Sequence, residues 1–156
     1  MFTIRPASLS DAAAISALLQ DLTRRFIAPD CTGEGAALLL QAMSESAIAG
    51  YIQQPNFDYL LGEMNAELVA VVATRDNSHL YHLFVASHCQ GKGYAAKLFA
   101  EAKARCLQRA DTKIFTVNSS LYALPVYQHL GFVAVGGQRD TQGIRDVPMQ
   151  LVLTQQ

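Results

Sequence analysis

The chain has 156 residues, of which 51% are hydrophobic and 16% are charged, a composition that excludes a disordered chain. The net charge is −1 and the 12 basic residues are scattered, which excludes the basic face expected of a nucleic-acid-binding protein. This length and composition predict a single domain over residues 1–156.

The first third of the chain predicts one strand and the start of a helical region. Residues 2–5 alternate apolar and polar side chains up to Pro6, which is typical of a short strand. Ser8 and Asp11 have the spacing of a capping box, in which each side chain satisfies a free amide at a helix start. We therefore expect an amphipathic helix over residues 9–25.

The rest of the chain predicts a second helix at residues 34–53, then β-type runs separated by two more helices. Residues 64–67 are short and polar, as in a hairpin. Lys97, Glu101 and Arg105 form a charge ladder that predicts an exposed helix face. The further strands are expected at residues 57–63, 68–74, 79–85, 113–117, 132–135 and 147–154, and the further helices at residues 94–109 and 121–130.

This order of elements predicts an α/β (α+β) fold. We expect a mixed, mainly antiparallel central sheet of about seven strands, flanked by four helices. The strand–helix–strand unit around residues 94–109 should contain the parallel, right-handed connection.

The cysteines and the apolar segments bear on where the protein works. Cys31, Cys89 and Cys106 form no C-x-x-C pair and their count is odd, which is untypical of disulfide scaffolds and tetrahedral metal sites. We expect three free thiols, a reducing compartment and no metal. No apolar run approaches the roughly 20 residues of a membrane span, and residues 1–6 lack the features of a secretory signal. The prediction is a cytoplasmic protein that binds no membrane.

The segment Gln90-Gly91-Lys92-Gly93-Tyr94-Ala95 lies between an expected strand and an expected helix. The first amides of a helix have no internal acceptor, and the helix dipole favours negative charge there. Gly91 and Gly93 allow positive φ and a close approach of the backbone to a phosphate, while Lys92 adds a positive charge. The segment matches neither the P-loop nor the dinucleotide fingerprint, so alone it indicates an anion site or an ordinary turn.

A second informative segment covers residues 118–132. Pro125 is tolerable in a helix only in its first turn, and Gly131 suits the left-handed residue that ends one. Tyr127 falls within this short helix, and a phenol needs a hydrogen-bond partner if it is buried. Core packing accounts for Val126, Leu130 and Phe132, but it accounts less well for a tyrosine at position 127.

Together, the two segments resemble the GNAT superfamily of acyl-CoA N-acyltransferases. The segment at residues 90–95 looks like the family signature Arg/Gln-x-x-Gly-x-Gly/Ala. Ala123, Tyr127 and Gly131-Phe132 resemble its second motif, an alanine followed by Tyr-x-x-x-Gly-Phe. The motifs cover about residues 80–135, and the order of the elements before them agrees with the family.

The resemblance implies an acetyl-CoA site between two diverging strands, the one at residues 79–85 and the one that begins at Lys113. The signature would bind the coenzyme A pyrophosphate, the end of the preceding strand would bind the pantetheine arm through its main chain, and Asn118 would bond the amide portion. The implied cofactor-binding residues are Leu83, Phe84, Val85, Gln90, Gly91, Lys92, Gly93, Tyr94, Ala95 and Asn118.

The resemblance also implies direct attack of an amine on the thioester in a ternary complex. Tyr127 matches the tyrosine that acts as general acid toward the coenzyme A sulfur. His82 is the candidate base, since its ordinary pKa lies near 6.5. His79, Glu63 acting through a water, or no dedicated base at all are the alternatives. Cys89 would serve as a nucleophile only in a two-step mechanism, which the resemblance disfavours.

The acceptor is expected to be the primary amine of a small molecule or a peptide. Its pocket should involve residues 25–34, the second helix and residues 136–146. The polar side chains expected there are Asp30, Glu34, Tyr51, Arg139 and Arg145. The family often forms homodimers. Two other hypotheses stay open at this point: a non-catalytic acyl-CoA-binding regulatory domain, and a structural or interaction domain in which the two glycines only form a turn.

Overall fold

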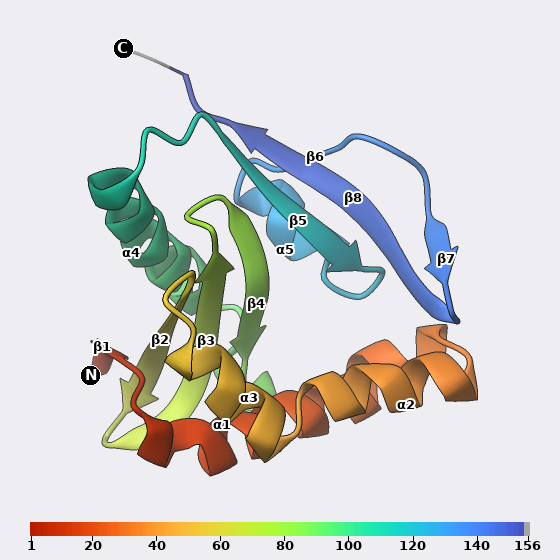
Figure 1. The fold of residues 1–156 in the computed structure, drawn as a ribbon, viewed down its shortest axis with the longest axis horizontal. Coiled ribbons are helices and arrows are strands. Elements are labelled where there is room, and N and C mark those ends of the chain that lie inside the picture. The colour runs from red at the N-terminus through yellow and green to blue at the C-terminus, as the bar shows by residue number, and fades with distance from the viewer. Residues whose placement is uncertain (155–156) are drawn as a thin grey trace.

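Over residues 1–154, the part of the chain that the computed structural model describes, the strands form one eight-stranded sheet (Figure 1). They are β1 (Phe2–Pro6), β2 (Phe57–Met64), β3 (Glu67–Arg75), β4 (His79–Val85), β5 (Ile114–Ser120), β6 (Val133–Ala134), β7 (Arg139–Thr141) and β8 (Ile144–Val152). The order is β1-β2-β3-β4-β5-β8-β6, with β7 paired to β8. Among these strands of the described residues, only β4 and β5 pair in parallel, which confirms the mixed, mainly antiparallel sheet.

The strand that the sequence did not predict is β7. Its three residues are all polar and exposed, so they show no alternation of apolar and polar side chains. The turn into β8 holds it in place. Gln142 and Gly143 have positive φ there, and the amide of Gly143 donates to the Asp140 carboxylate at 2.9 Å.

The helices of the same described residues are α1 (Ala12–Leu22), α2 (Gly33–Ala42), α3 (Glu45–Gln53), α4 (Tyr94–Arg109) and α5 (Leu124–His129). A π-helical turn, Thr23–Ile27, extends α1. The single helix expected at residues 34–53 is two, because Ser44 adopts an extended conformation and accepts a hydrogen bond from the Ala47 amide. None of the helices in the described part of the chain is long and apolar enough to cross a bilayer.

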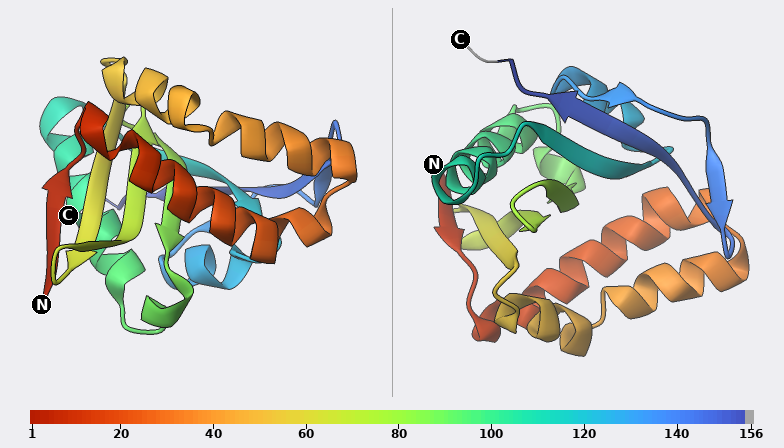
Figure 2. Two further views of the ribbon diagram at one scale, coloured as in Figure 1. Left: turned by 90° about the horizontal axis from the view of Figure 1, so that it is seen from below. Right: turned by 45° about the horizontal axis from the view of Figure 1, so that its top comes forward.

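Helices cover both faces of strands β2 to β4 (Figure 2). On one face Ile15 and Leu19 of α1 and Ile48 of α3 pack against Leu61 and Val71. The buried side chains on the opposite face include Leu98, Ala102, Cys106, Val72, Leu80 and Phe115. Neighbouring residues of β3 therefore point into different cores, and the central strands are buried on both sides.

The parallel strands β4 and β5 stay together only briefly. They pair at His79–Thr116 and Leu80–Val117, and then diverge with no further pairing (Figure 1). β4 continues to Val85 and β5 to Ser120. This confirms the splay that the resemblance implied. It also leaves one edge of β4 without a strand partner, and so opens the sheet at its centre.

The sequence predicted that Arg105 belongs to an exposed charge ladder, but in the structure it does not. Its guanidinium makes two hydrogen bonds to the Asp58 carboxylate of β2, at 2.7 and 3.0 Å, and Arg109 adds a third at 3.0 Å. Burial by itself would raise the pKa of Asp58, but the hydrogen bonds and charges of the two arginines outweigh burial and lower it. This cluster ties the second half of α4 to the sheet.

Asp58→Asn is expected to reduce the free energy of unfolding by about 1–3 kcal/mol near neutral pH. Because the folded-state pKa of Asp58 is depressed below 3.8, its contribution is present above about pH 4 and is lost as the pH falls through that lower value. Urea unfolding of both proteins at pH 7 and pH 3 measures this. Asp111→Asn, which removes an exposed partner of Lys113, should change little. An equal loss for Asp58→Asn at both pH values would contradict the ionic origin.

Candidate active site

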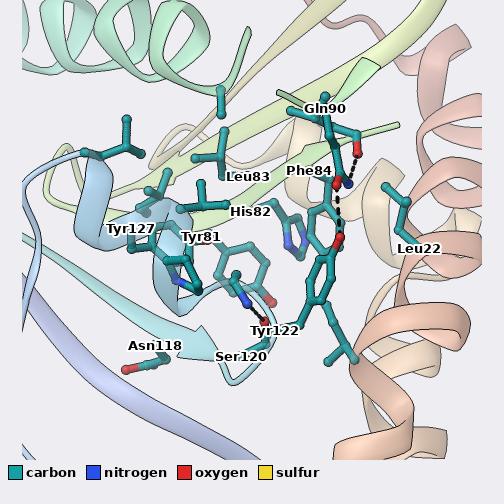
Figure 3. A pocket seen from close by; sticks show the side chains of 18 of the residues that line it. Leu22, Tyr81, His82, Leu83, Phe84, Gln90, Asn118, Ser120, Tyr122 and Tyr127 are labelled. Atoms are coloured by element: carbon teal, nitrogen blue, oxygen red, sulfur yellow. Dashed lines mark hydrogen bonds between the residues drawn. The ribbon is translucent and has the colours of Figure 1, made fainter. Parts of the chain in front are cut away.

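A cavity of about 880 Å³ opens where β4 and β5 diverge (Figure 3). Eleven of the twelve residues that the sequence and the resemblance assigned to the site line it. They are His82, Leu83, Phe84, Val85, Gln90, Gly91, Gly93, Tyr94, Ala95, Asn118 and Tyr127. Lys92 does not line the cavity. Candidates that are 45 residues apart in sequence are thus brought to one place.

The loop before α4 has the backbone conformation that only glycine adopts readily. Gly91 and Gly93 have φ of 79° and 80°, and a Cβ at either position would meet no atom within 4 Å. Gly93 immediately precedes the first turn of α4, whose amides have no internal acceptors. Open space, free amides and the positive end of a 16-residue helix suit a bound phosphate group.

The start of α4 packs against the edge strand of the sheet. The ring of Tyr94 stacks on that of Phe2, with centroids 4.1 Å apart and planes within 4°. Phe2 in turn occupies the space over Gly62, where a Cβ would collide with its ring. The loop therefore rests on β1 and β2 and does not depend on its own residues alone.

Gln90 links the loop to the other walls of the cavity. Its amide nitrogen donates to the Val85 carbonyl and its amide oxygen accepts from the Tyr122 hydroxyl, both at 3.0 Å (Figure 3). The ring of Tyr122 stacks on Phe26 of the π-helical turn, with centroids 4.8 Å apart. The sequence analysis missed Tyr122 and Phe26, since no spacing rule relates residues from such separate segments.

Tyr127 is presented to the cavity by α5. Pro125 lies in the first turn of this helix and Gly131 beyond its end has φ of 102°, as the sequence predicted. The side chain is 6% exposed and its ring packs edge-on against Phe132. Its hydroxyl makes no hydrogen bond to any residue within 1–154. Burial raises the pKa of Tyr127 above its ordinary range, so the phenol is a protonated donor facing the cavity.

His82 reaches the cavity because β4 contains a bulge. Ala73 pairs with His82 and Thr74 with Leu80, which leaves Tyr81 as the extra residue. Burial lowers the pKa of His82 to about 3, and a hydrogen bond with the Tyr81 backbone offsets this only in part. Its Nε2 atom is buried with no hydrogen-bond partner among the described residues. The ring is therefore neutral, with a free nitrogen.

The structure places the other candidate bases less favourably. Nδ1 of His79 is 2.7 Å from the Thr116 hydroxyl, and burial lowers the pKa of this imidazole as well. Glu63 is paired with Arg5 at 2.8 Å, on the far side of β2, and does not line the cavity. Cys89 lines it but is only 5% exposed, and all three cysteines are free thiols, as expected.

Asn118 lies within β5, whereas the sequence had placed it just beyond the end of this strand. Its side-chain oxygen accepts a hydrogen bond from Arg139 at 2.9 Å, and Arg139 also bonds Asp146 at 3.0 Å. None of residues 1–154 accepts a hydrogen bond from the Asn118 amide nitrogen, so both of its donors are available. The unpredicted strand β7, which carries Arg139, therefore orients a residue of the site.

The remaining wall of the cavity differs from the expected acceptor pocket. Of the five polar residues expected there, only Arg145 lines the cavity. Tyr51 instead accepts a hydrogen bond from the Tyr81 hydroxyl at 3.1 Å. The wall consists mainly of apolar side chains from α1, its extension, α2 and β8. These are Leu22, Ile27, Leu39, Ala42, Met43 and Ile144.

Among the described residues, no group of three or more His, Cys, Asp or Glu side chains could hold a metal ion. The splayed strands, the glycine loop at a helix start and the tyrosine facing the same cavity define an acetyltransferase fold. The family model for the acetyltransferase (GNAT) domain matches residues 27–153, and the chain belongs to this family.

Solved structures of N-acetyltransferases share this fold. A GCN5-related N-acetyltransferase from Rhodopseudomonas palustris has a TM-score of 0.83 and 20% identity, over 97% of this chain and 95% of that one. PaiA N-acetyltransferase from Thermoplasma acidophilum, in complex with coenzyme A, has a TM-score of 0.82 and 15% identity, over 98% and 99%. Spermidine N-acetyltransferase from Vibrio cholerae, with coenzyme A and spermine, has a TM-score of 0.67 and 17% identity, over 97% and 95%. No curated protein sequence matches the chain.

Proposed function

We propose that this protein transfers an acetyl group from acetyl-CoA to a primary amine, by direct attack in a ternary complex. The observation that carries the proposal is that the loop at residues 90–95 and the free hydroxyl of Tyr127 meet in one cavity. The complex of the similarly folded PaiA enzyme with coenzyme A supports the choice of donor.

The residues present fit acetyl-CoA in three ways. A Cβ at Gly91 or Gly93 would meet no atom within 4 Å, so the loop leaves room for a pyrophosphate beside the free amides at the start of α4. The unpaired edge of β4, at Leu83 to Val85, offers main-chain groups to a pantetheine arm. The free donors of Asn118 suit an amide carbonyl. In this arrangement Gln90 releases the Val85 carbonyl when the arm binds.

In the reaction, the amine nitrogen forms a bond to the thioester carbonyl carbon and the carbon–sulfur bond breaks. The sulfur leaves as a thiolate, and Tyr127 donates a proton or a hydrogen bond to it. The attacking amine loses one proton, which replaces the one given to the sulfur, so that the products are the amide, coenzyme A as its thiol and Tyr127 in its protonated form. The site contributes by holding both reactants together and by placing a protonated donor where negative charge develops.

His82 then hydrogen-bonds the substrate amine without changing its own protonation state at working pH. With a pKa of about 3 its imidazole is neutral, so Nε2 accepts a hydrogen bond from the amine nitrogen and orients its lone pair. The amine arrives already deprotonated. On this proposal the acidic limb of the pH–rate profile belongs to the amine and not to His82.

His82→Leu is expected to lower kcat/KM by up to about tenfold, the value of one hydrogen bond. The acidic limb of kcat/KM between pH 6 and 10 should keep its position. His82→Gln, which restores an acceptor, should recover part of the loss. A limb near pH 6–7 that disappears in His82→Leu would show instead that His82 is a titrating base.

The function is tested by calorimetry with acetyl-CoA, followed by thiol-release assays with amines. Absence of binding at millimolar acetyl-CoA would overturn the proposal. Normal binding without turnover on any amine would indicate an acyl-CoA-binding regulatory domain. Size-exclusion chromatography with light scattering tests the homodimer, which stays a prediction, as does the cytoplasmic location.

A further inference from the structure

One wall of the cavity is left over once the acetyl-CoA residues are assigned. Those residues come from β4, the loop, the start of α4, β5 and α5. Besides Cys89 and the turn at Tyr122 and Ala123, the rest of the lining comes from α1 and its extension, from α2 with Met43 after it, and from the start of β8. Helix α1 packs on the face of the sheet that carries Tyr81 and Phe84, and Figure 3 shows Leu22 of this wall on the same side of the cavity as Phe84. It is therefore the wall available to the amine.

Within residues 1–154, these two helices contribute only apolar side chains to this wall: Leu22 and Ile27 from α1 and its extension, and Leu39 and Ala42 from α2, with Met43 directly after it. Tyr81 and Phe84 extend the apolar surface onto β4. A substrate group in contact with these side chains loses its water without gaining hydrogen bonds, which favours hydrocarbon.

The same wall offers no free negative charge. Asp146 is the single carboxylate among the described residues that line the cavity, and Arg139 pairs with it at 3.0 Å. Its neighbour Arg145, which pairs with Asp140 at 3.5 Å, is the other charged residue of this wall. Asp30 and Glu34, which the sequence had placed here, do not line it. A second ammonium group on the acceptor would be buried without a counter-charge, at a high cost.

The outer end of this wall is closed by the backbone. The Thr32 amide at the start of α2 donates to the Gly143 carbonyl at 3.0 Å. Gly35 packs so closely that a Cβ would collide with the Gly143 backbone. α2 therefore contacts the β7–β8 turn, as Figures 1 and 2 show, and this contact lies in the way of an extended peptide at that end of the wall.

From these features we propose that the acceptor is a small molecule with one primary amine, carried on an apolar aliphatic or aromatic group and without a second cationic centre. The inference rests on the proposed function and names its substrate class. The apolar group lies against Leu39 and Met43, and the amine points toward Nε2 of His82.

The test measures kcat/KM by thiol release for five acceptors: isoamylamine, phenethylamine, putrescine, spermidine and a tripeptide with a free amino terminus. The two apolar monoamines are expected to exceed the others by at least about tenfold. A preference for the diamine, the polyamine or the tripeptide overturns this inference and leaves the acetyltransferase proposal standing. No turnover with any amine, despite acetyl-CoA binding, overturns the acetyltransferase proposal itself.

Leu39→Glu, with Leu39→Gln as its matched control, tests whether the wall at this position selects between amine substrates by charge. Leu39 is half-buried at the cavity wall, so both polar side chains fit with little loss of stability. Leu39→Glu should lower kcat/KM for phenethylamine by about tenfold and raise the putrescine-to-phenethylamine ratio well above that of Leu39→Gln. Acetyl-CoA affinity and Tm should match in the two variants. Equal ratios in both would show that this wall does not select by charge, and would overturn the inference.

Discussion

Tyr127→Phe is expected to lower kcat by about 100- to 10,000-fold, the range that general acid catalysis contributes. The change removes only the hydroxyl, and the ring keeps its packing against Phe132. Because this hydroxyl has no hydrogen-bond partner among the described residues, its loss leaves no buried group unsatisfied and stability should hardly change. Steady-state kinetics, acetyl-CoA calorimetry and thermal unfolding together should show loss of kcat with Kd and Tm preserved.

Tyr59 provides the matched control for Tyr127. It is also a buried tyrosine whose hydroxyl has no partner among the described residues, but it does not line the cavity. Tyr59→Phe should leave kcat unchanged and should not reduce stability. If the two variants had the same small effect on kcat, Tyr127 would be a packing residue and the general acid would lie elsewhere.

The fold was accessible from the sequence because its main signals are local. The apolar periodicity of α4 and the alternating or continuous apolar runs of β2 to β4 report which faces are buried. The bounds of β4 match the expected residues, 79–85, and α4 contains the whole apolar repeat from Tyr94 to Cys106 that predicted it. Gly91, Gly93 and Gly131 stand where positive φ is required, so the local conformation of both motifs is encoded by residue type.

The features that the sequence did not reveal depend on contacts between distant segments. Arg105 fits an exposed helical ladder by spacing, yet Asp58 is within reach only after β2 and α4 pack together. The bridge from Gln90 through Tyr122 to Phe26 joins three separate elements. The bulge that turns His82 into the cavity is a matter of strand register, which one strand alone does not determine.

The cavity wall proposed to bind the amine was also not predictable from the sequence, because it too depends on contacts between distant segments. Asp30 and Glu34 lie in the expected segments, but neither lines the cavity. The apolar side chains of α2 that line it look in the sequence like ordinary core residues. The proposed donor site is a short motif with required backbone conformations, whereas the proposed acceptor site is a surface assembled from four elements.

Gly93→Ala should weaken acetyl-CoA binding by about 10- to 100-fold, equivalent to losing one or two of the hydrogen bonds between loop amides and phosphate. Gly93 has φ of 80°, which costs an L-residue about 1–2 kcal/mol. The variant relieves that strain by rotating the backbone, which turns the neighbouring amides away from the anion. Calorimetry measures the affinity, and thermal unfolding should show a Tm lower by a few degrees, roughly 2–4 °C per kcal/mol.

Gly137→Ala is the control that shows whether replacing a glycine elsewhere in the chain has the same effect. Gly137 is exposed, has no positive φ, does not line the cavity, and would accommodate a Cβ with no atom within 4 Å. Its substitution should alter neither affinity nor kcat. If Gly93→Ala lowered Tm but bound acetyl-CoA as tightly as the unaltered protein, the loop would be only a turn. Loss of affinity in Gly93→Ala alone would mean that the left-handed conformation is what aims the amides of α4 at the pyrophosphate.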